Sequence, residues 1–126
     1  MHARAPWWLL FVVLATLAGC GAPDFAEVTG KVTLDGEPLV FATVEFQPPG
    51  GSPAYGVTGD DGTYRLEWSA TQSGVPIGQH RVRITSWRES KPKERERVPE
   101  RYNKATELAR EVKPGQQQID FELTTN

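Results

Sequence analysis

Apolar and polar residues alternate in short runs from Glu27 onward, and this alternation restricts the chain to extended strands. Successive side chains of a strand point to opposite faces, so a period of two predicts strands with one buried face. Loops and turns rich in Gly, Pro, Asp and Ser separate the runs. We predict an all-β, seven-stranded antiparallel Greek-key sandwich, Ig-like in architecture, over residues 27–124. The predicted inward rows are Val28, Gly30, Val32 and Leu34; Ala42, Val44 and Phe46; Tyr55 and Val57; Tyr64, Leu66 and Trp68; Val82 and Ile84; and Ile119, Phe121 and Leu123.

The connections between these runs have recognisable turn chemistry. Asp35-Gly36 and Asp61-Gly62 are pairs that tolerate the positive φ that tight turns demand. The run at 79–87 is the longest strand expected, and the charged residues 88–98 after it are expected to form a loop. A helical turn or two is expected within 99–109 and nowhere else.

The acidic turn Asp60-Asp61-Gly62 invites a calcium-site interpretation, which the spacing excludes. If Gly62 were the sixth position of an EF-hand loop, positions one, three and twelve would be Val57, Gly59 and Trp68. None of these offers a side-chain oxygen that suits calcium. We therefore expect a turn here, and no metal site.

The N-terminal segment has the composition of an export signal. The apolar run 7–17 is about 11 residues long, too short to span a bilayer but suited to the hydrophobic region of a signal peptide. It ends in Leu17-Ala18-Gly19-Cys20, which contains the one cysteine of the chain and resembles the lipobox of bacterial lipoproteins. The resemblance implies that residues 1–19 are removed and that Cys20 is acylated, with residues 20–26 as a tether. The alternative is an ordinary signal peptide with an incidental cysteine.

Location, size and charge follow from that cleavage. In lipoprotein sorting, Gly21 directly after the cysteine implies a cell-envelope protein of the outer membrane, if the organism has one. The mature chain has 107 residues, enough for one small domain, and no second cysteine for a disulfide. Loss of Arg4 changes the formal charge from −2 to −3, which argues against nucleic acid as a partner. We expect a monomer attached to the membrane by its lipid.

Three motifs in the strand region carry a second resemblance. They are Val28-Thr29-Gly30-Lys31-Val32-Thr33-Leu34-Asp35-Gly36-Glu37-Pro38-Leu39 with Ala42-Thr43-Val44-Glu45-Phe46 after it, Thr58-Gly59-Asp60-Asp61-Gly62-Thr63-Tyr64, and Pro76-Ile77-Gly78-Gln79-His80-Arg81-Val82. Together they resemble carboxypeptidase regulatory-like domains, which have a transthyretin-like (prealbumin-like) sandwich. The segments 98–103 and 112–115 are similar to short bacterial lipoproteins that carry this one domain. The resemblance implies the fold and a structural, surface or accessory role; His80 departs from it, since a tyrosine is usual there.

The chain lacks the groups that hydrolytic catalysis needs. The mature chain has one histidine, His80, which its parity places on the buried face of a strand, and no Gly-x-Ser-x-Gly motif. Hydroxyisourate hydrolases share the transthyretin-like sandwich but end in Tyr-Arg-Gly-Ser, whereas this chain ends in Leu123-Thr124-Thr125-Asn126. We predict that the protein is not an enzyme and uses no cofactor.

The basic segment after the longest strand holds the candidate contact residues. Residues 81–101 contain eight basic residues against four glutamates, whereas the rest of the mature chain has five basic and twelve acidic residues. The candidates for partner contact are Trp87, Arg88, Lys91, Lys93, Arg95 and Arg97. Parity directs Trp87 outward, where it could stack on a sugar or seat a partner. We expect instead that a bend at the strand end folds Trp87 back over the core, which leaves a solvated loop.

Two functions remain open at this stage. The first is a lipid-anchored cell-envelope module with a non-catalytic structural or protein-interaction role. The second is a carbohydrate-binding or adhesive module that uses Trp87 and the basic loop on anionic glycans. Solvent exposure of Trp87 is the feature that separates the two.

Overall fold

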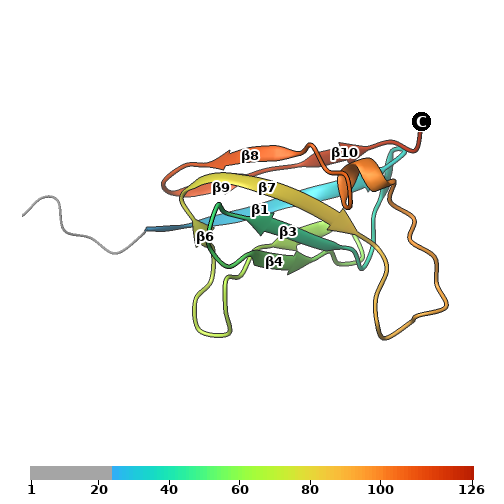
Figure 1. Cartoon of the computed structure of the whole chain (residues 1–126), viewed down its shortest axis with the longest axis horizontal. Helices are drawn as coiled ribbons and strands as arrows, with labels where there is room; N and C mark the ends of the chain where they lie inside the picture. Colours follow the sequence, from blue (N-terminus) through green and yellow to red (C-terminus); the bar gives the residue numbers. More distant parts are fainter. Residues whose placement is uncertain (1–23) are drawn as a thin grey trace, which may run out of the picture.

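The computed structural model describes residues 24–126, and these residues form an all-β sandwich, as predicted (Figure 1). The predicted signal peptide, Cys20 and most of the tether lie outside the described residues. No helix within 24–126 is long and apolar enough to cross a membrane. The elements are β1 (Phe25–Leu34), β2 (Glu37–Pro38), β3 (Thr43–Gln47), β4 (Ala54–Val57), β5 (Thr63–Arg65), β6 (Val75–Pro76), β7 (Gly78–Thr85), the 3-10 helix η2 (Glu100–Tyr102), β8 (Ala109–Val112), β9 (Gln116–Gln118) and β10 (Phe121–Leu123).

Strand β1 organises the first sheet. It pairs with β2, β5 and β6 in antiparallel and with β9 and β10 in parallel. The second sheet has the order β4-β3-β7-β8 and is antiparallel throughout. The described residues form ten short strands rather than the predicted seven, because several different partners of two or three residues share the length of β1. The first strand also starts at Phe25, so the tether predicted to reach Ala26 is shorter by two residues.

The core lies between the two sheets and is rich in aromatic rings. Phe46 of β3 and Phe121 of β10 are buried, with ring centroids 6.2 Å apart, and Tyr64 of β5 lies 6.4 Å from Phe121. The predicted inward parity is confirmed for β1, β3, β5, β7 and β10, in which the alternate residues are buried. The short helical turn expected within 99–109 is η2.

The inward parity predicted for β4 is wrong. Tyr55 and Val57 are 48% and 58% exposed, while Ala54 and Gly56 are buried. In the antiparallel register Tyr55 lies opposite Glu45, whose face of β3 is the outer one. The small residues of this strand therefore face the core, and the large ones face solvent.

The prediction that Trp68 is a core residue is also wrong. Beyond β5 the chain stays extended through Leu66, which is buried, and Glu67, which pairs with Tyr55, but it bends at Trp68, so the inward parity does not extend to that residue. Its side chain is 37% exposed and packs against the ring of Phe25, with centroids 5.1 Å apart.

The sandwich has two ends, which we call the N-terminal pole and the distal pole (Figure 1). At the N-terminal pole, the Ile77 N–H donates to the carbonyl of Asp24 at 3.0 Å, so the entering chain lies beside the start of β7. Strand β7 then runs eight residues away from that point. The loop 86–98 therefore leaves β7 at the distal pole, on the side of the molecule opposite the chain entry.

Candidate functional site

The loop 86–98, called the distal loop below, is closed at its base by the side chain of Glu96. Oε2 of Glu96 accepts hydrogen bonds from the amide and the hydroxyl of Ser86, both at 2.6 Å, and from the amide of Val98 at 3.1 Å. Oε1 accepts from the amide of Trp87 at 3.2 Å. Loops of this size whose ends are held close together pack on themselves and present a defined shape. One carboxylate therefore holds the two ends of the loop together.

The same contacts fix the charge of Glu96. Desolvation alone raises the pKa of a carboxyl, but the hydrogen bonds from Ser86, Trp87 and Val98 stabilise its charged form and outweigh that effect. The pKa of Glu96 is therefore lower than the ordinary glutamate value. The carboxylate stays ionised at neutral pH and keeps accepting all four bonds.

Further polar contacts join the loop to the edge of β7. The Ser86 hydroxyl accepts from the Arg97 amide at 2.7 Å, and the buried Asn103 side chain donates to the carbonyl of Ile84 at 3.1 Å. Beyond Arg81, β7 has no partner from β8, so these contacts cover its open edge. The loop and the segment around η2 thus belong to the fold at this pole.

Trp87 lies on an open groove of about 750 Å³ on the outer side of β7. The side chain is 43% exposed, and Nε1 lies 3.4 Å from the carbonyl of Pro92 across the loop. The expectation that Trp87 folds back over the core is wrong, because the Glu96 carboxylate holds its amide and the chain keeps the outward parity of β7. The groove is lined by Arg83, Thr85, Trp87, Glu96, Val98, Pro99, Glu100, Asn103 and Lys104.

Most of the predicted basic residues gather around a second hollow of about 450 Å³ on the distal loop. Its lining includes Arg88, Lys91, Arg95 and Arg97, together with Phe41 from the connection between β2 and β3. The Arg88 guanidinium lies 5.1 Å from the centroid of the Phe41 ring, a cation–π distance. Phe41 is half-exposed and has a φ of 57°, which is uncommon for an aromatic residue.

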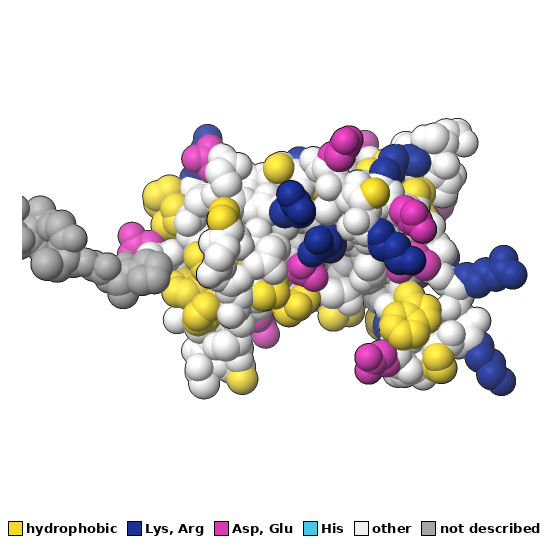
Figure 2. Space-filling view, viewed as in Figure 1, with side chains coloured by type: hydrophobic (Ala, Val, Ile, Leu, Met, Phe, Trp, Pro, Cys, Tyr) yellow, Lys and Arg dark blue, Asp and Glu magenta, His cyan; other side chains and the backbone are white. Residues whose placement is uncertain are grey.

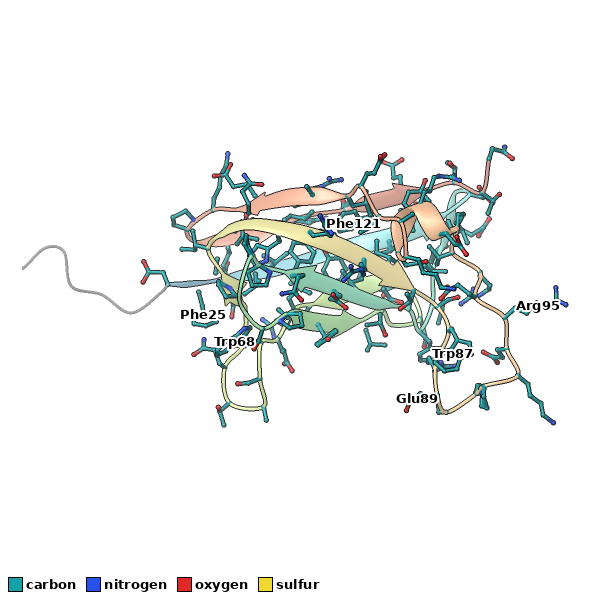
Figure 3. The ribbon with its side chains drawn as sticks, viewed as in Figure 1. Phe25, Trp68, Trp87, Glu89, Arg95 and Phe121 are labelled. Carbon is teal, nitrogen blue, oxygen red and sulfur yellow. The ribbon has the colours of Figure 1, made fainter. Side chains whose placement is uncertain are left out.

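The structure thus divides the predicted site residues into two groups. Trp87 lines the groove, whereas Arg88, Lys91, Arg95 and Arg97 line the hollow. Lys93 lines neither and is exposed. In Figure 3, Arg95 extends from the distal loop away from the body of the molecule.

The charges of the distal loop are only partly balanced within it. Glu94 lies 3.9 Å from Arg88 and 3.7 Å from Lys91, distances typical of weak surface ion pairs. Arg97 uses its guanidinium to donate to the carbonyl of Val40 at 3.1 Å. Figure 2 shows Lys and Arg side chains on this face from the middle of the molecule to the end that carries the distal loop, with Asp and Glu side chains among them. Such a surface attracts anionic groups at distances up to a Debye length.

His80 is buried, as its parity predicted, and its surroundings are those of a structural residue. Its Nε2 lies 2.6 Å from the carbonyl of Pro76, and its ring packs 5.7 Å from that of Phe46. Because a carbonyl only accepts, Nε2 donates this hydrogen bond. Over the described residues, no three His, Cys, Asp or Glu side chains form a group that could hold a metal ion.

Sequence reasoning missed Phe41, Ser86, Glu96 and Asn103. Glu96 is one acid within a charged run, so nothing in the sequence around it indicates a special role. Asn103 is part of the motif 98–103 quoted for the lipoprotein resemblance, and that motif was the available signal. Phe41 is distant from the loop in sequence, and only the fold brings it beside Arg88.

Together, the fold and the site define a β-sandwich module with a basic, aromatic loop at one end. No protein-family model matches the chain, and no curated protein sequence matches it. Among solved structures, the chain is similar to a DUF3823 family protein from Parabacteroides merdae ATCC 43184, with a TM-score of 0.46 and 16% sequence identity. That match covers 80% of this chain and 46% of the other, so this chain spans less than half of that structure.

Proposed function

We propose that this protein is a lipid-anchored cell-envelope module with a non-catalytic structural or protein-interaction role. It is attached through Cys20 to a membrane, the outer one where the organism has two, and acts as a monomer. Its domain is of the carboxypeptidase regulatory-like, transthyretin-like type, on the strength of the three motifs quoted above. The observation that carries the proposal is the placement of the distal loop at the pole opposite the chain entry.

This placement would orient an anchored domain relative to the membrane. An acyl group on Cys20 holds the N-terminal pole near the bilayer, and β1 and β7 then run away from it. The distal loop, with Trp87 and its basic residues, faces away from the membrane and is accessible to a partner. The Glu96 contacts hold the loop in one shape before a partner arrives, which lowers the entropy lost on binding.

The alternative proposal is a carbohydrate-binding or adhesive module, and the observation that favours it is the exposed ring of Trp87. An exposed tryptophan on a groove offers an apolar face on which a sugar ring stacks, with polar groups around it to accept and donate hydrogen bonds. Lys104 lines the same groove and suits a carboxylate of an acidic glycan, and Arg83, which also lines it, is paired with Glu45 at 3.1 Å.

The lipid anchor is tested with Cys20→Ala. Because acylation requires the cysteine thiol, the variant should incorporate no labelled fatty acid and should leave the membrane fraction. Metabolic labelling and fractionation of both proteins measure this. A variant that is still labelled and stays membrane-bound overturns the proposal.

The choice between partners is tested by pull-down from cross-linked envelopes and by titration with polygalacturonate, with a neutral glucan as the control. Capture of one protein in stoichiometric amount, lost in Trp87→Ala, supports the interaction module. Saturable binding of polygalacturonate but not of glucan, lost in the same variant, supports the glycan-binding alternative.

A further inference from the structure

The N-terminal pole carries an aromatic pair that the distal site does not use. The rings of Phe25 and Trp68 lie 5.1 Å apart at an interplanar angle of 58°, and Trp68 is 37% exposed. Trp68 Nε1 donates to the carbonyl of Ser52 at 3.1 Å, which fixes the orientation of the indole. Figure 3 shows both side chains beside the point at which the described chain begins. The pair is thus a rigid, partly exposed apolar surface at the end of the domain where the chain enters.

The loops next to this pair carry no charge. Residues 48–53 read Pro-Pro-Gly-Gly-Ser-Pro and residues 69–74 read Ser-Ala-Thr-Gln-Ser-Gly, with no Asp, Glu, Lys or Arg in either. The hydrogen bond from Trp68 to Ser52 joins the pair to the first loop, and the second follows Trp68 directly. An exposed aromatic surface beside uncharged loops is costly to leave in water but costs little to place among lipid headgroups.

The length of free chain limits how far this pole can be from the bilayer. Because Asp24 is hydrogen-bonded to Ile77, only Gly21, Ala22 and Pro23 separate Cys20 from the folded domain. Four fully extended residue steps span at most roughly 14 Å. If Cys20 lies at the membrane surface, the domain therefore cannot move far from it, and the pole that faces the surface is the one with Phe25 and Trp68.

We propose that the Phe25–Trp68 pair inserts into the interfacial region of the bilayer to which Cys20 is attached. Tryptophan is enriched at this depth because its ring prefers the boundary between hydrocarbon and water. This inference rests on the proposed lipid anchor and adds to it a protein surface that contacts lipid. The contact sets the tilt of the domain, so that the distal loop faces away from the membrane. Asp24 and Glu67 flank the pair, so the surface suits zwitterionic rather than anionic lipid.

The two tryptophans of the mature chain make a matched pair of probes, because they lie at opposite poles. The lipidated Trp87→Phe protein reports Trp68 alone, and lipidated Trp68→Phe reports Trp87 alone. Each is reconstituted into phosphatidylcholine vesicles that contain a phosphatidylcholine with a spin-labelled acyl chain, and lipid quenching is compared with iodide quenching from water. We expect lipid quenching of Trp68 to exceed that of Trp87 by about threefold or more, with iodide showing the reverse order.

A longer tether sharpens this result. Insertion of a Gly-Ser linker of about ten residues between Pro23 and Asp24 weakens the constraint, so lipid quenching of Trp68 should fall partway but persist if the rings have their own affinity for the interface.

Equal lipid quenching of the two tryptophans in a protein that carries the acyl label overturns this inference. Protection of Trp68 that grows with protein concentration in lipid-free buffer also overturns it, because a second copy then covers the pair. Failure to incorporate the acyl label counts against the anchor itself, so the two failures are distinguishable.

Discussion

The chain reverses direction in loops at both poles of the sandwich, but different interactions hold the loops at the two poles. At the N-terminal pole the two loops beside the Phe25–Trp68 pair, 48–53 and 69–74, are uncharged, and the second is closed by backbone hydrogen bonds from Trp68 to Gln72 and from Gly74 to Leu66, both 3.0 Å. At the distal pole the loop 86–98 is highly charged, and the side chain of Glu96 makes four of the hydrogen bonds that close its base. A charged loop buries little apolar surface, so it needs an internal polar anchor to keep one shape. We therefore expect stability at the distal pole to depend on pH and salt more than stability at the N-terminal pole.

The difference also separates the roles that we propose for the poles. Aromatic rings beside uncharged loops suit the lipid surface, and an unbalanced set of guanidinium and ammonium groups suits a partner in water. Strand β1 extends between the poles, pairing with Pro76 at Phe25 and with Leu123 at Leu34. Changes along it or in the core beneath should therefore affect both ends, whereas changes within a loop should affect one.

The largest effect is expected from removal of a ring in the core between the poles. Phe46→Ala or Phe121→Ala should lower the free energy of unfolding by about 3–5 kcal/mol, because each leaves a cavity among buried rings. Denaturant unfolding followed by circular dichroism measures this, and Tyr55→Ala on the exposed face is the control. Losses below about 1 kcal/mol at both phenylalanines would contradict the assigned core.

One glycine at each pole should give the next largest effect. Gly62 (φ 82°) and Gly74 (φ 91°) would both direct a Cβ at a carbonyl of β1, 2.7 Å from Val32 O and 2.6 Å from Ala26 O. Gly62→Ala and Gly74→Ala should each cost roughly 2 kcal/mol or more, the price of a positive φ plus the displaced backbone. Gly36→Ala, with a φ of 86° and open space around it, isolates the dihedral cost. A much smaller loss of stability at either glycine would mean that the backbone of β1 moves away from the new Cβ there. Strand β1 would then be held less firmly at that pole than we infer.

The sequence predicted most of the fold because large apolar residues alternate in most strands. It failed at β4, where Ala54 and Gly56 face the core and the larger Tyr55 does not. Hydrophobicity alone cannot identify an inward row made of small residues; the cross-strand register does so. It failed at Trp68 because periodicity does not reveal where a strand ends.

The candidate site could be predicted only in part. Parity correctly directed Trp87 outward, and charge counting located the basic residues. The contacts that shape the loop join Glu96 to Ser86 and Arg88 to Phe41, and these depend on tertiary placement. A single sequence carries no pattern for such contacts, because a glutamate in a charged run looks the same whether it is solvated or holds four donors.

Glu96→Ala should loosen the distal pole alone. Loss of four acceptor contacts should cost about 1–2 kcal/mol in global stability, since much of the loop can open without unfolding the core. Hydrogen exchange at the amides of Ser86, Trp87 and Val98 should accelerate, while exchange at Gly74 stays unchanged. Glu89→Ala, at an exposed glutamate of the same loop, is the control (Figure 3). Unchanged exchange at all three amides would contradict the anchor role of Glu96.

Wild type and Glu96→Ala should also differ in how their stability depends on pH. The folded-state pKa of Glu96 lies below the ordinary value of 4.5, so its stabilisation is complete above that value and is lost as the pH falls through the lower, folded pKa. The stability difference between wild type and Glu96→Ala should be constant between about pH 6 and pH 8 and should shrink in acid. A difference that grows as the pH falls would mean that the hydrogen bonds favour the protonated carboxyl.

The smallest effect on stability, and the largest on binding, is expected at Trp87. Because its ring is 43% exposed and lies outside the core, Trp87→Ala should lower stability by less than about 1 kcal/mol. In the Trp68→Phe background, Trp87 should emit at long wavelength and be quenched readily by iodide, and a bound glycan or protein should reduce that quenching.

Reversal of charge at Lys91, Lys93, Arg95 and Arg97 should slow association and flatten its dependence on salt, because the attraction being screened is gone. A Trp87→Ala variant that loses several kcal/mol would instead make the ring part of the packing at the distal pole. The basic residues would then serve only to keep a structural loop in water.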